Sequence, residues 1–195
     1  MNNFITLLII SFVTVNSFSQ INNDYLKVGE KAPIITGIDQ FDNTINSNDI
    51  LKEKKMLVVF YRGNWCPYCR KHLASLQENL EELSKKGLFV IVVTPEKVEK
   101  INETTKKLAA TFSIIHDKDN SIMNSYKVAF MVNEKNVTSY FGFTQRKIKE
   151  YNAQNNDTLP VPATYLINID GKIGYVHYDP NHHERSDFKE IIKLL

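Results

Sequence analysis

Two continuous apolar runs stand out in the pattern of hydrophobic and polar positions along the chain. Residues 56–61 (MLVVFY) and 87–95 (GLFVIVVTP) are rich in β-branched and aromatic side chains, which is typical of strands buried on both faces. Between them, leucines recur at spacings of three and four over residues 73–83, which predicts an amphipathic helix. Residues 96–112 are polar on one side and apolar on the other, which predicts a second helix. This order predicts two parallel strands joined by a right-handed crossover.

The segments on either side of this unit carry turn signals. Apolar and polar residues alternate around an Asp-Asn turn at residues 42–43, which predicts a short β-hairpin. Residues 163–178 form two alternating runs joined by Asp-Gly, a strong signal for an antiparallel hairpin. Residues 185–195 have the capping residues and periodicity of a final helix. Residues 129–159 lose the pattern, and we interpret them as an insertion, with some helix around residues 145–151, before the last strand-strand-helix unit.

Together these elements predict an α/β fold in which a mixed central sheet is flanked by helices. A chain of 195 residues, 43% of them apolar, is long enough for one core of ordinary size, so we expect residues 20–195 to form a single domain. The 24 basic and 22 acidic side chains are spread along the whole sequence. Because they leave no basic patch, we expect no nucleic acid partner.

The N-terminus has the features of a secretory leader. An apolar run over residues 4–15 precedes Ser17 and Ser19, which form a small-x-small cleavage pattern. The run is too short for a membrane helix, so no stable membrane insertion is expected. We predict that residues 1–19 are a signal peptide cleaved before Gln20, and that the mature protein is periplasmic or secreted. An uncleaved anchor is the alternative.

Both cysteines of the chain lie in the segment CPYC, between the first buried strand and the helix that follows it. Disulfide exchange requires a thiolate within reach of a second sulfur, and a CxxC at a helix N-terminus supplies both. We predict that Cys66 is the nucleophile, because it meets the free N–H groups and the positive end of the helix dipole. Arg62 adds positive charge that lowers the pKa of Cys66. Cys69 is then the resolving cysteine, and Pro67 suits the first helical position.

Other interpretations of the cysteine pair stay open at this point. A structural disulfide across so short a loop would restrict the unfolded chain very little. A metal site needs two further ligands, which the adjacent His182 and His183 could supply. Covalent haem attachment requires a histidine directly after the second cysteine, where this sequence has Arg70. We favour a redox role, and expect neither a metal ion nor another cofactor.

Four segments of the chain follow one another in an order known from a protein family. They are VGEKAP, FYRGNWCPYC, HDKDNSIMNSYKV and PVPATYLINIDGK. In this order they resemble the AhpC/TSA and redoxin branch of the thioredoxin superfamily, and above all its peroxiredoxin-like proteins that carry a CxxC. The resemblance covers residues 27–195. It implies a thioredoxin-like fold with an N-terminal β-hairpin, and a thiol as the electron donor.

The resemblance also implies a substrate site around the cysteines. In thioredoxin-like proteins a cis-proline precedes the strand facing the CxxC, and Pro162 in VPAT matches it, although a stiff loop is the alternative. The backbone of Val161 would then lie beside Cys66 and pair with an extended substrate. Trp65 and Tyr68 flank the cysteines and are expected to form an apolar floor, although core packing is the alternative for Trp65. The predicted substrate-binding residues are therefore Trp65, Pro67, Tyr68, Val161 and Pro162.

The sequence departs from the family pattern at positions that bear on the reaction. Peroxiredoxins that reduce peroxides carry Thr or Ser three residues before the reactive cysteine, and an Arg near the strand that Pro162 opens in this sequence. Here Gly63 and Pro162 occupy those places. Phe60 occupies the position of the buried Asp of thioredoxin, so proton transfer to Cys69 needs another group. His72, six residues after the first cysteine, is expected at the surface.

The sequence therefore favours an exported thiol-disulfide oxidoreductase that acts on a protein or small-molecule disulfide, with Cys66 as nucleophile and Cys69 as resolving cysteine. The alternative is a peroxiredoxin-like thiol peroxidase with antioxidant activity, in which Cys66 is the peroxidatic cysteine and reduces a hydroperoxide. A third hypothesis is a binding module that uses the scaffold and the surface around Trp65 without turnover.

Overall fold

The two buried runs of the sequence become neighbouring parallel strands at the centre of a mixed sheet. The computed structural model describes residues 24–133, 141–154, 156–181 and 183–195, and the predicted signal peptide lies outside these described residues. In spatial order, the strands of the sheet are β5 (Ser113–His116), β4 (Leu88–Thr94), β3 (Lys55–Phe60), β8 (Ala163–Ile167) and β9 (Ile173–Tyr178). The first three are parallel, and β8 runs antiparallel to both of its neighbours.

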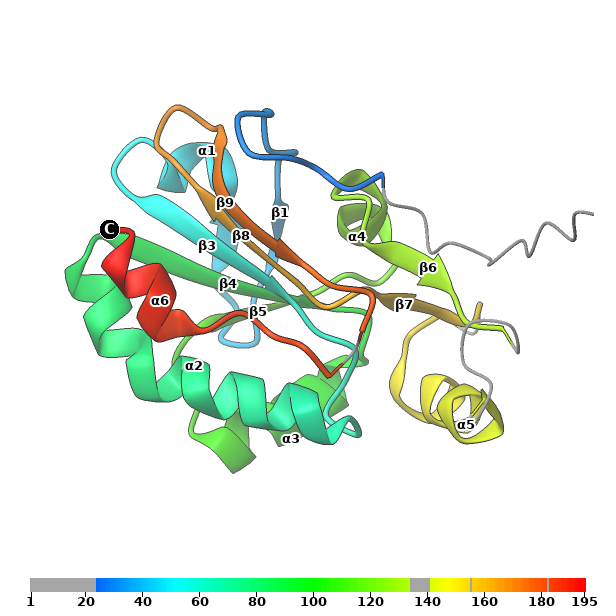
Figure 1. Cartoon of the computed structure of the whole chain (residues 1–195). Coiled ribbons are helices and arrows are strands. Elements are labelled where there is room, and N and C mark those ends of the chain that lie inside the picture. The colour runs from blue at the N-terminus through cyan, green and yellow to red at the C-terminus, as the bar shows by residue number, and fades with distance from the viewer. Residues whose placement is uncertain (1–23, 134–140, 155, 182) are drawn as a thin grey trace, which may run out of the picture.

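Helices cover both faces of this sheet (Figure 1). One face is covered by α2 (Pro67–Lys85), α3 (Val98–Leu108) and α6 (Phe188–Lys193), whose apolar side chains share one core cluster. The other face is covered by α1 (Ser47–Ile50) and α4 (Ser121–Ser125), together with the N-terminal segment. The predicted thioredoxin-like arrangement of a mixed sheet between helices is confirmed.

The central strand β3 shows why a continuous apolar run is needed here. Its side chains alternate between the two faces of the sheet. Leu57 and Val59 lie in the cluster under α2, whereas Met56, Val58 and Phe60 lie in the cluster on the opposite face. Because both faces are covered, every residue from Met56 to the end of the strand is buried, which a strand with one polar face could not achieve.

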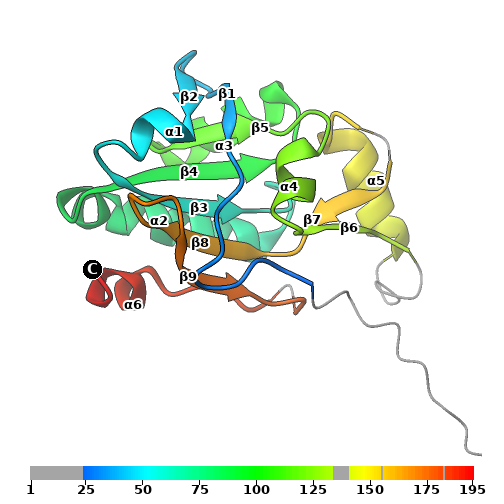
Figure 2. The ribbon, with the colours of Figure 1, turned by 90° about the horizontal axis from the view of Figure 1, so that it is seen from above.

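The N-terminal hairpin and the insertion are the two additions to this core. The hairpin consists of β1 (Thr36–Ile38) and β2 (Thr44–Asn46), which pair antiparallel around the predicted Asp-Asn turn. The insertion contains β6 (Ala129–Met131), which pairs with β7 (Thr158–Pro160), and α5 (Phe141–Tyr151). Figures 1 and 2 both show β6, β7 and α5 together beyond one end of the main sheet.

The structure corrects the prediction for Pro162. Every peptide bond of the described residues is trans, including the bond before Pro162, so the expected cis-proline is wrong. The segment before β8 is instead tied into the insertion, because the Val161 N–H donates to the Val128 carbonyl at 2.7 Å. That donor is therefore already used within the chain and cannot pair with a substrate strand.

None of the helices in the described ranges combines the length and apolar content that crossing a bilayer would require.

Candidate active site

The cysteine pair lies where β3 ends and α2 begins, as the sequence predicts. Cys66 has the extended backbone of an N-cap residue, and Pro67 occupies the first turn, where its missing N–H leaves no hydrogen bond unmade. Both cysteines are free thiols and both are buried, Cys66 at 2% exposure and Cys69 at 0%. The loop before them is held by Arg70, whose guanidinium donates to the Asn64 carbonyl at 2.7 Å.

The two thiols act strongly on each other. A hydrogen bond with Cys69, together with burial, raises the pKa of the Cys66 thiol, against the opposing charge of Arg62. Burial also acts to raise the pKa of Cys69, but the hydrogen bond from Cys66 and the charges of Arg185 and Arg62 outweigh it and lower that pKa to about 5. At neutral pH the pair therefore holds one negative charge and one proton.

The negative charge favours the sulfur of Cys69, which is opposite to the expectation for Cys66. The hydrogen bond from Cys66 is the larger cause, and the next is the charge of Arg185, whose Nη2 lies 3.6 Å from the Cys69 sulfur. A Cys66 thiolate would form only if the shared proton moved from Cys66 to Cys69. Arg185 lies 116 residues from Cys69 in the chain, and no local sequence signal points to it.

An open cavity of about 350 Å³ lies over the Cys66 side of the pair. Its walls are mainly apolar and include several aromatic rings. Of the two cysteines, Cys66 lines the cavity and Cys69 does not. The residues lining it are Arg62, Trp65, Cys66, Pro67, Tyr68, Phe143 and His183. Three of the predicted substrate-binding residues thus lie around Cys66, whereas Val161 and Pro162 are buried at the neighbouring end of β8 and do not line the cavity.

Aromatic contacts shape the walls of this cavity. The rings of Trp65 and Phe143 meet edge to face with centroids 6.2 Å apart, and Tyr68 stacks on His183 at 4.3 Å. Trp65 also packs against the small core of the insertion. Phe143 comes from α5, so the insertion contributes a wall of the site, a contact that the irregular sequence of this segment did not reveal.

Arg62 is a buried cation at the floor of the cavity. Its side chain is 2% exposed, and its guanidinium carbon lies 5.2 Å from the centre of the Trp65 ring, within range of a cation–π interaction. Its Nε atom is buried without a hydrogen-bond partner among the described residues. The predicted electrostatic role of Arg62 fits this placement, because its charge favours the ionised form of both cysteines.

Gly63 lies in a conformation that excludes other residues. Its φ is +152°, and a Cβ atom at this position would lie 2.4 Å from the Trp65 Nε1 and 2.9 Å from a carboxylate oxygen of Glu96. The Thr or Ser of peroxide-reducing relatives therefore cannot be accommodated here without moving the indole. The packing of Trp65 and Glu96 around Gly63 therefore leaves no room for a side chain that carries this hydroxyl.

Glu96 is a fully buried carboxyl group beside this loop, at 0% exposure. It accepts hydrogen bonds from the Tyr61 hydroxyl at 2.7 Å and from the Asn64 N–H at 2.8 Å. Burial raises its pKa to about 7, against the lowering effect of these two bonds. Sequence reasoning did not rank Glu96, because it follows β4 and reaches the site only through the packing of β4 against β3.

His72 is buried, so the expectation of a surface position is wrong. Its ring stacks on Phe188 at 4.6 Å, and its Nε2 lies 3.1 Å from the Ser186 hydroxyl. Burial, helped by the charge of Arg185, lowers the pKa of His72 to about 3. A neutral imidazole in such a place holds α2 against α6 and the segment before it.

The described residues contain no group of three or more His, Cys, Asp or Glu side chains arranged to hold a metal ion. His182, one of the two histidines considered as ligands, lies outside the described residues.

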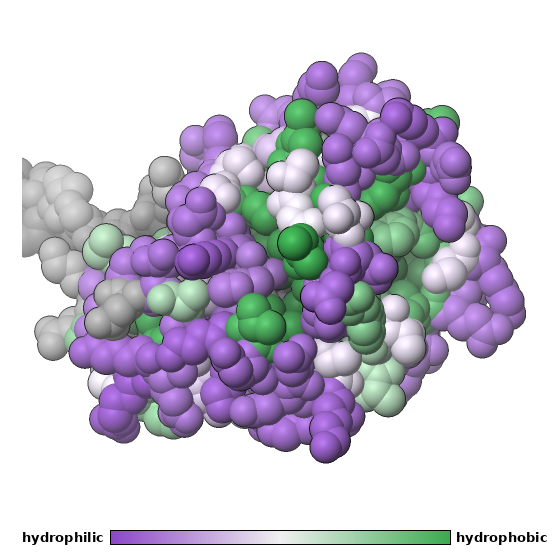
Figure 3. Space-filling model, turned by 180° about the vertical axis from the view of Figure 1, so that it is seen from behind, coloured by the Kyte–Doolittle hydropathy of each residue, from purple (hydrophilic) through white to green (hydrophobic). Residues whose placement is uncertain are grey.

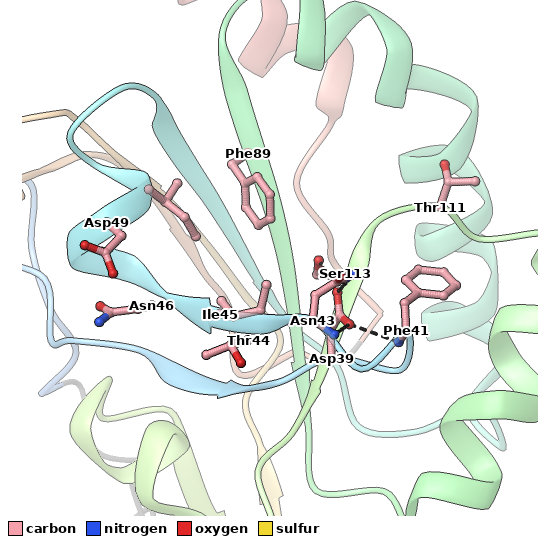
Figure 4. A pocket seen from close by; sticks show the side chains of 11 residues that line it. Asp39, Phe41, Asn43, Thr44, Ile45, Asn46, Asp49, Phe89, Thr111 and Ser113 are labelled. Carbon is pink, nitrogen blue, oxygen red and sulfur yellow. Dashed lines mark hydrogen bonds between the residues drawn. The ribbon is translucent and has the colours of Figure 1, made fainter.

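A second pocket lies beside the N-terminal hairpin, away from the cysteines (Figure 4). Its carboxylate Asp39 already accepts from the Ser113 hydroxyl at 2.8 Å and from the N–H groups of Phe41 and Asn43. These bonds fasten the hairpin to β5. We assign no chemistry to this pocket.

On the face of the molecule seen in Figure 3, apolar side chains gather in the middle and hydrophilic side chains surround them.

Comparisons with known proteins agree with this geometry. Peroxiredoxin Bcp of Escherichia coli (strain K12) is 29% identical over 162 residues, which cover 82% of this chain and 92% of that protein. The crystal structure of peroxidoxin BcpB from Mycobacterium tuberculosis matches with a TM-score of 0.65 at 13% identity, covering 87% of this chain and 96% of that one.

The fold is also similar to the thioredoxin domain of a thiol-disulfide oxidoreductase from Bacteroides vulgatus. That match has a TM-score of 0.58 at 20% identity and covers 87% of this chain and 98% of the other. The sequence profile of the AhpC/TSA family matches residues 28–176, which is most of the chain. This protein therefore belongs to the AhpC/TSA family.

Proposed function

We propose that this protein is a thiol-dependent peroxidase in which Cys66 reduces a hydroperoxide and Cys69 resolves the product. The sequence alone favoured disulfide exchange, but the relatives named peroxiredoxin favour the alternative. The observation that carries the proposal is the placement of the pair. Cys66 reaches an open apolar cavity, while Cys69 lies behind it in contact with Arg185 and can receive the proton of Cys66.

The reaction uses this arrangement in two steps. The Cys66 thiolate attacks one oxygen of the hydroperoxide, the O–O bond breaks, and the other oxygen leaves as an alcohol or water after taking up a proton. Cys66 becomes a sulfenic acid. Cys69 then attacks the Cys66 sulfur, water leaves, and a disulfide forms. A thiol donor returns two electrons and restores the reduced pair.

Thiol-disulfide exchange is the second candidate, and Gly63 favours it. With glycine here the site lacks the hydroxyl that peroxide-reducing relatives use, and the indole of Trp65 blocks the addition of one. The same pair would then attack a substrate disulfide at Cys66, and Cys69 would release the mixed disulfide.

One comparison separates the two candidates. The reduced protein is offered hydrogen peroxide, an aromatic hydroperoxide or a protein disulfide, and the consumption of each is followed with dithiothreitol as the reductant. We expect both hydroperoxides to be consumed at least about 100-fold faster than by a free thiol of equal concentration, since proton transfer by a positioned group alone contributes about this much. Cys66→Ser should abolish the activity.

Fast turnover of the protein disulfide, with hydroperoxides consumed no faster than by the free thiol, would overturn the peroxidase proposal in favour of exchange. Turnover of none of the three substrates would contradict both.

A further inference from the structure

Oxidation of the cysteine pair consumes one proton that neither the pair nor the substrate supplies. The reduced pair carries one proton and one negative charge at neutral pH. A hydroperoxide ROOH becomes ROH and H₂O, which together contain three hydrogens bound to oxygen. ROOH brings one of them and the pair brings one, so each oxidation of the pair needs one further proton, which is released again when a thiol donor reduces the pair. The same count holds for a disulfide substrate, which leaves as two thiols.

The structure offers one carboxyl group beside the pair that is suited to hold that proton. Glu96 is fully buried, and no cation forms an ion pair with it anywhere in the described ranges. Burying a carboxylate without a cation is costly, so burial favours the protonated form. Asp117, another buried carboxyl, caps α4 by accepting from the Ile122 and Met123 N–H groups and is far along the chain from the cysteines.

The contacts of Glu96 connect it to both ends of the segment that carries the site. Tyr61, which donates to its Oε2, directly follows β3, and Asn64, whose N–H donates to its Oε1, lies two residues before Cys66. The Glu96 N–H is itself held by the Thr94 hydroxyl at 3.3 Å. Two hydrogen bonds thus hold the carboxyl group and a third holds its backbone, and the bond from the Asn64 N–H links the charge of the carboxyl group to the active-site loop.

Several groups from different elements act on Glu96. Burial is the main cause of its raised pKa, and the Tyr61 hydroxyl just after β3 and the Asn64 N–H of the loop lower it. The negative charge of Cys69 on α2 and that of Glu103 on α3 raise it further. Oxidation of the pair removes the charge on Cys69. The carboxyl group then ionises more easily, which is the direction needed to release a proton during oxidation.

We propose that Glu96 holds the proton consumed when the Cys66–Cys69 pair is oxidised, and takes it up again when the pair is reduced. The inference rests on the proposed redox function of the pair, but it applies to both a hydroperoxide and a disulfide as oxidant. Glu96 does not touch the reacting atoms in this account; it acts through the loop and the Tyr61 hydroxyl.

The test is the number of protons taken from solution when the reduced protein is oxidised. The measurement is made in weak buffer with a pH indicator at about pH 6, between the pKa of about 5 at Cys69 and about 7 at Glu96. One arm uses hydrogen peroxide and the other uses hydroxyethyl disulfide, so a failure of the peroxidase proposal is separated from a failure of this one.

We expect the wild-type protein to take up clearly less than one proton per molecule, because Glu96 ionises more easily once the charge on Cys69 is gone, and Glu96→Gln to take up about one in whichever arm oxidises the pair. Asp117→Asn, which changes a buried carboxyl outside the site, is the matched control and should behave like the wild type. Equal uptake by the wild type and Glu96→Gln would overturn the inference.

Tyr61→Phe provides a second test in case Glu96→Gln does not fold. Because the Tyr61 hydroxyl lowers the pKa of Glu96, its removal should raise the pH at which the reduced protein loses the infrared band of a protonated carboxyl group. A band that disappears at the same pH in Tyr61→Phe and the wild type would also contradict the proposal.

Discussion

Gly63 is the residue that most clearly separates this site from the family pattern. Its positive φ and the indole nitrogen above it leave no room for a side chain. The cavity lining instead includes the side chains of Arg62 and Cys66. The glycine is thus required by the local packing and is not a simple loss of the family's hydroxyl group.

Gly63→Ala should destabilise the protein by about 2–4 kcal/mol, of which about 1 comes from the strained backbone and about 1–3 from the displaced neighbour. Urea denaturation checks this. Gly87→Ala is the matched control, because Gly87 also has a positive φ, +81°, but a Cβ there would meet no heavy atom within 4 Å. It should cost about 1 kcal/mol. Equal costs at the two positions would show that the indole does not confine Gly63.

At the level of single residues, the sequence located the cysteines but not the groups that set their charge. CPYC is a local motif, and its role could be predicted because a clear strand pattern precedes it and a clear helix pattern follows it. Arg185 and Glu96 come from other parts of the chain and contact the site only after β4 and the segment before α6 have packed. Neither has a spacing to the cysteines that a motif could encode.

At the level of elements, the β3–α2 junction was predictable because both of its sides have strong periodicity. The start of α2 at Pro67 follows from the fixed φ of proline and from the leucines that face the core. The strand β8 was also predicted, but the path of the residues that lead into it was not. Because β6 pairs with β7, the Val161 N–H lies within hydrogen-bond distance of the Val128 carbonyl. This contact is long-range, and the polar, irregular sequence of the segment gives no signal for it.

The insertion gives α5 a direct role in the cavity, and Phe143 tests it. Phe143→Ala should raise the KM for an aromatic hydroperoxide about 2- to 10-fold, the range expected for loss of one aromatic contact, and leave hydrogen peroxide turnover within about twofold. Steady-state kinetics with both substrates provides the measurement.

Phe41→Ala is the matched control for this substitution, because Phe41 is 47% exposed against 45% for Phe143 but lines the pocket by the hairpin. It should change neither parameter. An unchanged KM in Phe143→Ala would show that substrates do not contact α5.

For the whole molecule, the fold class was predictable because few known arrangements accommodate this order of apolar runs, turns and helices together with two buried parallel strands. The reaction was harder to predict, since disulfide exchange and peroxide reduction use the same pair of sulfurs. Both reactions would use the cavity around Cys66, whose lining comes from the loop after β3, the start of α2, the insertion and the segment before α6.

The central claim is that Cys66 is oxidised by a hydroperoxide and Cys69 resolves it. Mass spectrometry after one equivalent of hydrogen peroxide tests it most directly. The wild type should lose two hydrogens as the disulfide forms, and Cys69→Ser should gain one oxygen at Cys66 that a sulfenic-acid reagent traps. Oxygen gained at Cys69 in Cys66→Ser, with Cys66 left unmodified in Cys69→Ser, would contradict the account.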